Sequence, residues 1–97
     1  AFQIGETAQI HSGGILQATP HAVRGSSASG VSRQTFAVFM EPNWDEPVHC
    51  PDGIAPENAQ SQNAATNLPR GVPPLHKRWN NSMDFSEFAL ATLAEYH

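Results

Sequence analysis

The chain has 97 residues, with five Lys or Arg against nine Asp or Glu, which gives a formal net charge of −4. This length suits one small domain, and the acidic balance argues against nucleic acid as a partner, because phosphate binding needs a basic surface. No apolar run approaches the ~18 residues that a membrane-spanning helix requires, so we expect no membrane segment.

The first 42 residues predict short strands joined by turns. Residues 7–11 alternate loosely and predict a short strand, and the glycine pair in residues 12–14 predicts a turn, because glycine reaches positive φ at little cost. Residues 15–23 predict a second strand. Residues 31–40, rich in Val, Thr and Phe, predict a third strand that is apolar on both faces and therefore buried on both sides.

After this region the chain predicts a long irregular segment and then a helix. Residues 43–82 are rich in turn-forming residues, and residues 55–68 have the composition of an exposed, disordered loop. Residues 83–97 contain the one convincing helix, which starts with a capping-box pattern formed by Asp84 and Glu87. Apolar side chains follow at helical spacing and predict a face that packs on a sheet.

Three side chains in the predicted strands point to chemistry. Arg33 lies on the strand that we expect to be buried, where a guanidinium needs an anion or several acceptors. Thr35 shares that face, and an arginine beside a hydroxyl is a good receptor for a carboxylate. A structural salt bridge is the alternative for Arg33. His21 also lies on a predicted strand among apolar neighbours, where a lone histidine is more often structural than a metal ligand.

Five elements stand in order along the chain: Gly5-Glu6, Ser12-Gly13-Gly14, His21-Ala22-Val23, Arg33-Gln34-Thr35 and Phe39 to Pro42. The ordered set resembles the C-terminal core of the iron(II)/2-oxoglutarate-dependent oxygenases of the isopenicillin N synthase-like type, which read G-D, S-N-G, H-R-V, R-x-S and F-x-x-P. The resemblance implies a mainly β fold, the C-terminal portion of a double-stranded β-helix (jelly roll) followed by a C-terminal α-helix.

The same resemblance implies the site residues and the chemistry. His21 would be one ligand of Fe(II), and Arg33 with Thr35 would grip the far carboxylate of the co-substrate 2-oxoglutarate. The family's other two protein ligands come from an upstream H-x-D, and these 97 residues contain no such motif. We therefore expect the C-terminal segment of a dioxygenase that oxidises a small organic substrate, with the upstream remainder of the oxygenase domain as its partner.

Three departures from the family pattern leave other functions open. Ala22 stands where the family often has Arg, Glu6 stands where Asp is usual, and the interval from His21 to Arg33 is 12 residues, longer than in the family. Ala22 and the longer interval suggest a divergent subgroup with an altered substrate or no turnover. The alternatives are a catalytically inactive jelly-roll module that binds a partner, and a truncated product without independent function.

Other polar groups in the chain favour ordinary structural roles. The single cysteine, Cys50, excludes an internal disulfide and fits a reducing compartment, so we expect a cytoplasmic protein, and a loop thiol is favoured over a nucleophile. His11 lies outside the family's ligand positions, and the acidic residues of segment 45–52 favour a solvated loop over a metal site. In segment 76–79 we expect Trp79 to pack on the body of the protein and the basic side chains to stay in water.

Overall fold

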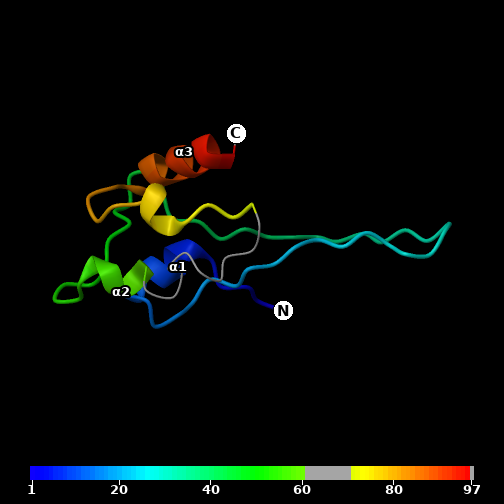
Figure 1. The fold of residues 1–97 in the computed structure, drawn as a ribbon, viewed down its shortest axis with the longest axis horizontal. Helices are drawn as coiled ribbons and strands as arrows, with labels where there is room; N and C mark the ends of the chain where they lie inside the picture. Colours follow the sequence, from blue (N-terminus) through cyan, green and yellow to red (C-terminus); the bar gives the residue numbers. More distant parts are fainter. Residues whose placement is uncertain (61–70, 97) are drawn as a thin grey trace.

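The computed structural model describes residues 1–60 and 71–96 as a small helical body from which a long arm projects (Figure 1). The body contains α1 (Glu6–His11), α2 (Pro56–Gln60), the 3₁₀ helix η2 (Leu75–Lys77) and α3 (Phe85–Tyr96). The arm, residues 20–40, runs out and back as two extended limbs and is exposed at every position. It stretches the molecule to 53 Å and raises the radius of gyration to 15.3 Å, against about 12.5 Å for a compact chain of this length.

The predicted mainly β fold, a portion of a jelly roll, is wrong. Residues 1–60 and 71–96 contain no β-strand, and their one isolated bridge joins Pro47 to Asp84. Residues 7–11 lie in α1, and neither residues 15–23 nor residues 31–40 form a strand ladder. A strand needs neighbours that pair with its backbone N–H and C=O groups, and the two limbs of the arm have no such sheet beside them.

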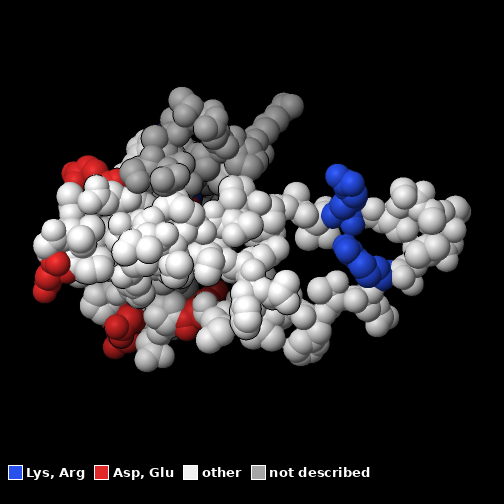
Figure 2. Space-filling model, turned by 90° about the horizontal axis from the view of Figure 1, so that it is seen from below, with Lys and Arg blue, Asp and Glu red and all other residues white. Residues whose placement is uncertain are grey.

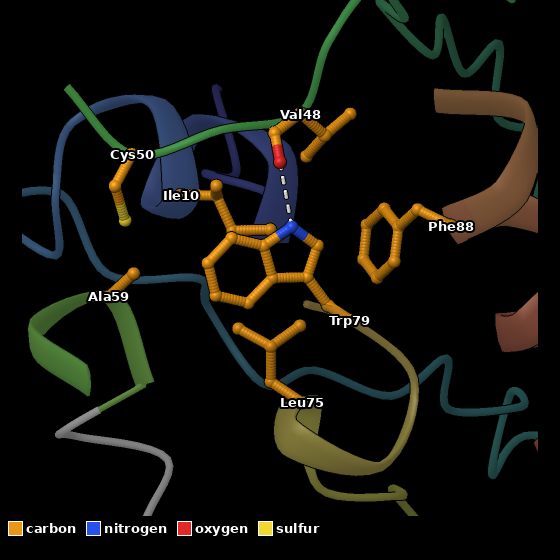
Figure 3. Close-up of a cluster of buried hydrophobic side chains, with 7 residues drawn as sticks. All are labelled: Ile10, Val48, Cys50, Ala59, Leu75, Trp79 and Phe88. Carbon is orange, nitrogen blue, oxygen red and sulfur yellow. Dashed lines mark hydrogen bonds between the residues drawn. The ribbon is translucent and has the colours of Figure 1, made fainter. Parts of the chain in front are cut away.

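The core of the body surrounds Trp79 (Figure 3). Its indole Nε1 donates a hydrogen bond to the backbone oxygen of Val48 at 2.7 Å, so the one polar atom of this buried ring is satisfied. Every helix contributes to the cluster, whose buried members are Ile10, Val48, Cys50, Ala59, Leu75, Trp79 and Phe88. Burial of Trp79 confirms that this side chain packs on the body.

A buried ion pair ties α1 to the C-terminal half. Arg78 is 1% exposed, and its Nη1 and Nη2 donate to Glu6 Oε1 at 2.8 Å and to Oε2 at 2.6 Å. Further hydrogen bonds reach Thr92 Oγ1 in α3 and the Pro73 backbone oxygen, and the guanidinium carbon lies 5.9 Å from the centroid of the Phe88 ring. The prediction that the charges of segment 76–79 stay in water is therefore wrong for Arg78.

The helix predicted near the C-terminus is present as α3, and its start is the predicted capping box. Asp84 Oδ1 accepts a hydrogen bond from the Glu87 backbone N–H at 2.9 Å, and the Asp84 N–H donates to Glu87 Oε1 at 3.4 Å. The Ser86 hydroxyl and the Glu87 N–H hold the pKa of Asp84 below its usual value. The cap therefore stabilises α3 above about pH 4 and weakens as the pH falls further. The buried face of α3 meets the core through Phe88 instead of a sheet.

A tight turn fastens α1 against α2. Gly13 and Gly14 take φ values of 66° and 90°, which confirms the turn predicted for residues 12–14. The buried Gln9 adds a side-chain clasp, because its Nε2 donates to the Ala59 oxygen at 2.6 Å and its Oε1 accepts from the Ala18 N–H at 2.8 Å. Of the loop predicted at residues 55–68, residues 56–60 form α2 and residues 61–68 lie outside the described residues.

We expect Glu6→Gln to lower the free energy of unfolding by about 2–3 kcal/mol, because it leaves the buried guanidinium of Arg78 without its counter-charge. The loss should fall below that of a fully buried pair, since the Glu6 side chain is 29% exposed. Urea unfolding measures the effect, and Glu95→Gln on the exposed part of α3 is the matched control, with a change within about 0.5 kcal/mol. Equal midpoints for the two variants would contradict the role of the pair.

Gly14→Ala should cost at least about 2 kcal/mol, because the new methyl group would overlap the backbone oxygen of Asn58 at a φ that L-residues rarely adopt. Gly25→Ala is the control, since a methyl group there meets open space. Thermal unfolding of both variants checks the difference, and a stable Gly14→Ala protein would contradict the close approach of α1 and α2.

Candidate functional site

His21 lies on the outgoing limb of the arm with one ring nitrogen already engaged. Its Nδ1 is 2.8 Å from the backbone oxygen of Thr19. A carbonyl oxygen can only accept, so Nδ1 is the donor in this contact, and in the neutral ring Nε2 is then the nitrogen with the lone pair. Nε2 has no partner within residues 1–60 and 71–96. Metal-binding histidines usually show this arrangement, in which one ring N–H is fixed by a carbonyl and the other nitrogen faces the ion.

Arg33 lies on the returning limb, and its environment differs from the expected one. The side chain is exposed, and its Nη2 donates to the backbone oxygen of Arg24 at 3.2 Å. The prediction of a buried Arg33 is therefore wrong, and the need for a buried counter-ion does not arise. The remaining N–H groups of the guanidinium stay available for an anion. No hydrogen bond joins Thr35 to Arg33 in the part of the chain that the structure describes.

The arm brings the predicted site residues to neighbouring limbs. The bond from Arg33 to Arg24 places these two residues opposite each other, and His21 precedes Arg24 by three positions on the outgoing limb. At the rise of an extended chain this separation is about 10 Å. His21 and Arg33 therefore lie on facing limbs in the same part of the arm, although no contact joins them.

The arm and the body carry opposite charge. Residues 20–40 include Arg24 and Arg33 and no Asp or Glu. A hollow between the two limbs is lined by both arginines and by the small residues of segment 25–27, and Figure 2 shows the basic side chains of the arm set apart from the acidic ones of the body. Such a basic hollow suits a carboxylate or another small anion.

The described residues of this chain do not make an iron site by themselves. No group of three or more His, Cys, Asp or Glu side chains that could hold a metal ion occurs within residues 1–60 and 71–96. His11 does not join His21, because its Nε2 donates to the Pro47 backbone oxygen at 3.1 Å and keeps the ring on the body. The acidic segment 45–52 likewise gathers no metal-binding group.

Cys50 belongs to the core and not to a catalytic site. The thiol is buried, and burial, with a smaller contribution from the carboxylate of Glu57, raises its pKa. A raised pKa keeps the sulfur in the neutral thiol form, which is a poor nucleophile. The Cys50 backbone N–H donates to Asn81 Oδ1 at 2.8 Å, which fixes this part of the chain against the segment before α3.

Sequence reasoning missed two features of the body. One is the pairing of Arg78 with Glu6, and the only sequence signal for it is the placement of an arginine directly before the core residue Trp79. The other is a groove that contains Trp44 and Phe85, whose ring centroids lie 5.8 Å apart. The two aromatic residues are 41 positions apart in the sequence (85 − 44), so local patterns do not connect them.

None of the helices in the described parts of the chain is long and apolar enough to cross a membrane. Comparison with protein-family models, with curated proteins and with solved structures found no match to this chain.

Proposed function

We propose that this chain contributes part of the active site of an iron(II)/2-oxoglutarate-dependent oxygenase whose substrate is a small organic molecule. His21 is assigned as one iron ligand, and Arg33 with Thr35 as the receptor for the far carboxylate of 2-oxoglutarate. The observation that carries the assignment is the hydrogen bond from His21 Nδ1 to the Thr19 oxygen. In the neutral ring, a proton on Nδ1 satisfies this contact and leaves Nε2 as the metal-binding atom.

The proposal requires two more protein ligands from outside the described residues. We assign them to the upstream remainder of the oxygenase domain, which is also the proposed partner of this chain. The arm suits such a contact, because it exposes several large apolar side chains. Those on the returning limb are Val31, Phe36, Val38, Phe39 and Met40, exposed by 58%, 94%, 75%, 83% and 90%.

The arrangement of charge supports the co-substrate assignment. The arm carries two guanidinium groups and no carboxylate, so a dicarboxylate such as 2-oxoglutarate meets attraction there and repulsion over the acidic body. Within residues 1–60 and 71–96, Arg33 donates one hydrogen bond, to a backbone oxygen, so it can offer a two-pronged contact to a carboxylate. The proposed compartment is the cytoplasm, which suits a chain whose one cysteine is a free thiol.

A binding protein without turnover is the second candidate. The exposed apolar side chains of the arm favour it, because an arm of this kind binds a partner whether or not a metal is present. Both candidates use the arm, and they differ in whether His21 and Arg33 act on small ligands. Consumption of 2-oxoglutarate by the complete protein separates them.

We expect His21→Ala in the complete protein to weaken Fe(II) binding about tenfold or more, because the variant lacks the Nε2 ligand. Iron content after anaerobic loading measures this directly, and 2-oxoglutarate consumption should fall with it. His49→Ala, at another exposed histidine, is the matched control and should keep its iron. A His21→Ala protein with full iron content would remove His21 from the site.

Arg33→Lys should raise the KM for 2-oxoglutarate roughly 10- to 150-fold, which corresponds to about 1.5–3 kcal/mol for a lost charge-assisted hydrogen bond. Lysine keeps the charge but cannot donate two parallel bonds to one carboxylate. Iron content and melting temperature should stay unchanged, because the Arg33 side chain is exposed. Lys77→Arg, at an exposed basic residue of the body, is the control and should leave the KM unchanged. An unchanged KM in Arg33→Lys would remove this residue from the co-substrate site.

A further inference from the structure

A groove of about 400 Å³ opens on the body, away from the tip of the arm. Its lining includes Trp44, Phe85 and Leu93 of α3, together with the acidic residues Glu6 and Glu41. The Trp44 side chain is 62% exposed and Leu93 is 56% exposed, so large apolar surface faces the groove without a covering element. The groove therefore combines aromatic side chains with acidic residues.

The two aromatic residues are held in place by backbone hydrogen bonds. The Ser86 N–H donates to the Trp44 oxygen at 3.0 Å, and the Phe85 N–H donates to the Glu46 oxygen at 2.9 Å. The rings meet at an interplanar angle of 44° with their centroids 5.8 Å apart. Because the backbone on both sides is fixed, the groove is preorganised and a ligand need not order it.

The charges around the groove select a cation. Glu6 is neutralised by its two hydrogen bonds to Arg78, whereas Glu41 forms no ion pair within residues 1–60 and 71–96. All nine acidic residues of the chain lie outside the arm, and the described body contains Lys77 and Arg78 as its only Lys or Arg. The field of the body is therefore negative, and an aromatic face adds attraction for a cation within about 6 Å of the ring centroid.

We propose that this groove binds a small organic cation with apolar substituents, of the alkylammonium class. The methyl groups of such a cation contact the faces of Trp44 and Phe85 and the side chain of Leu93. Its positive charge is balanced by Glu41. A neutral ligand of the same shape would gain the apolar contact but not the attraction to the rings and the carboxylate. The proposal does not depend on iron, on 2-oxoglutarate or on the residues of the arm.

Choline and its uncharged carbon isostere 3,3-dimethylbutan-1-ol form a matched pair of probes. Each is titrated into the full chain while the two indole N–H signals are followed by nuclear magnetic resonance. Trp44 should shift saturably with choline, whereas Trp79 should not, since its N–H is buried and bonded to Val48. Choline should bind about fivefold or more tightly than the isostere, which is the size expected of a cation–π contact.

Three variants test the roles of the residues. Trp44→Leu keeps an apolar side chain but removes the ring, so the preference for choline should disappear, with the amide signal of Phe85 as the readout. Glu41→Gln should weaken choline about threefold and leave the isostere unchanged. Asp52→Asn, at an acidic residue outside the groove, should leave both probes unchanged. The Trp79 indole signal reports in each variant that the core is folded.

Several outcomes would overturn the proposal. Equal affinity for choline and the isostere in the unsubstituted chain would show an apolar groove without cation selectivity. A Trp44 signal that shifts on dilution without ligand, together with a concentration-dependent sedimentation coefficient, would show that a second copy of the chain covers the groove. Parallel shifts of the Trp44 and Trp79 indole signals would show that the probe binds non-specifically and not in the groove.

Discussion

The buried guanidinium of Arg78 is the constraint on which the body depends. A charge that has left water costs several kcal/mol unless its donors are met, and here Glu6 meets two of them in a paired contact. The remaining bonds go to Pro73 and Thr92, so one side chain fixes α1, the segment before η2 and α3 at the same time. Nε of Arg78 is buried and lacks a partner among the described residues, so one N–H donor of this side chain stays unsatisfied. Its neighbour Trp79 centres the apolar core, and two consecutive residues thus organise both the polar and the apolar contacts of the body.

The arm and the body differ in burial and in the number of contacts that hold them. In the body, buried side-chain groups such as Gln9 and Trp79 find partners in distant segments. The arm has few internal bonds, the Arg33-to-Arg24 contact among them, and no buried residue. Its local stability therefore lies at the low end of the molecule, which is typical of segments that order on contact with another surface. This contrast fits the proposal that His21 and Arg33 act only together with groups from elsewhere.

Local signals in the sequence predicted local structure, and long-range contacts explain what they missed. The capping box of α3 and the turn at Gly13 and Gly14 depend on neighbouring residues and were both correct. Burial of Arg78 depends on Glu6, which is 72 positions away in the sequence. Local patterns do not show this pair, so the prediction that the Arg78 charge stays in water was wrong. The loose alternation of residues 7–11 is too short to separate a strand from a helix, and tertiary packing of Ile10 favours α1. For the candidate site, spacing placed His21 and Arg33 in one region, but apolar flanking residues wrongly suggested that Arg33 is buried.

The order in which the core residues appear along the chain bears on synthesis. Ile10 of α1 leaves the ribosome long before Trp79 and Phe88, with which it forms the core. The ion pair of Glu6 with Arg78 is delayed to a similar extent. The core cannot close around the indole until the C-terminal segment has emerged, because Leu75, Trp79 and Phe88 belong to the same buried cluster as Ile10 and Ala59. At synthesis rates of about 5–20 residues per second, the nascent chain spends several seconds with these side chains and the whole arm uncovered.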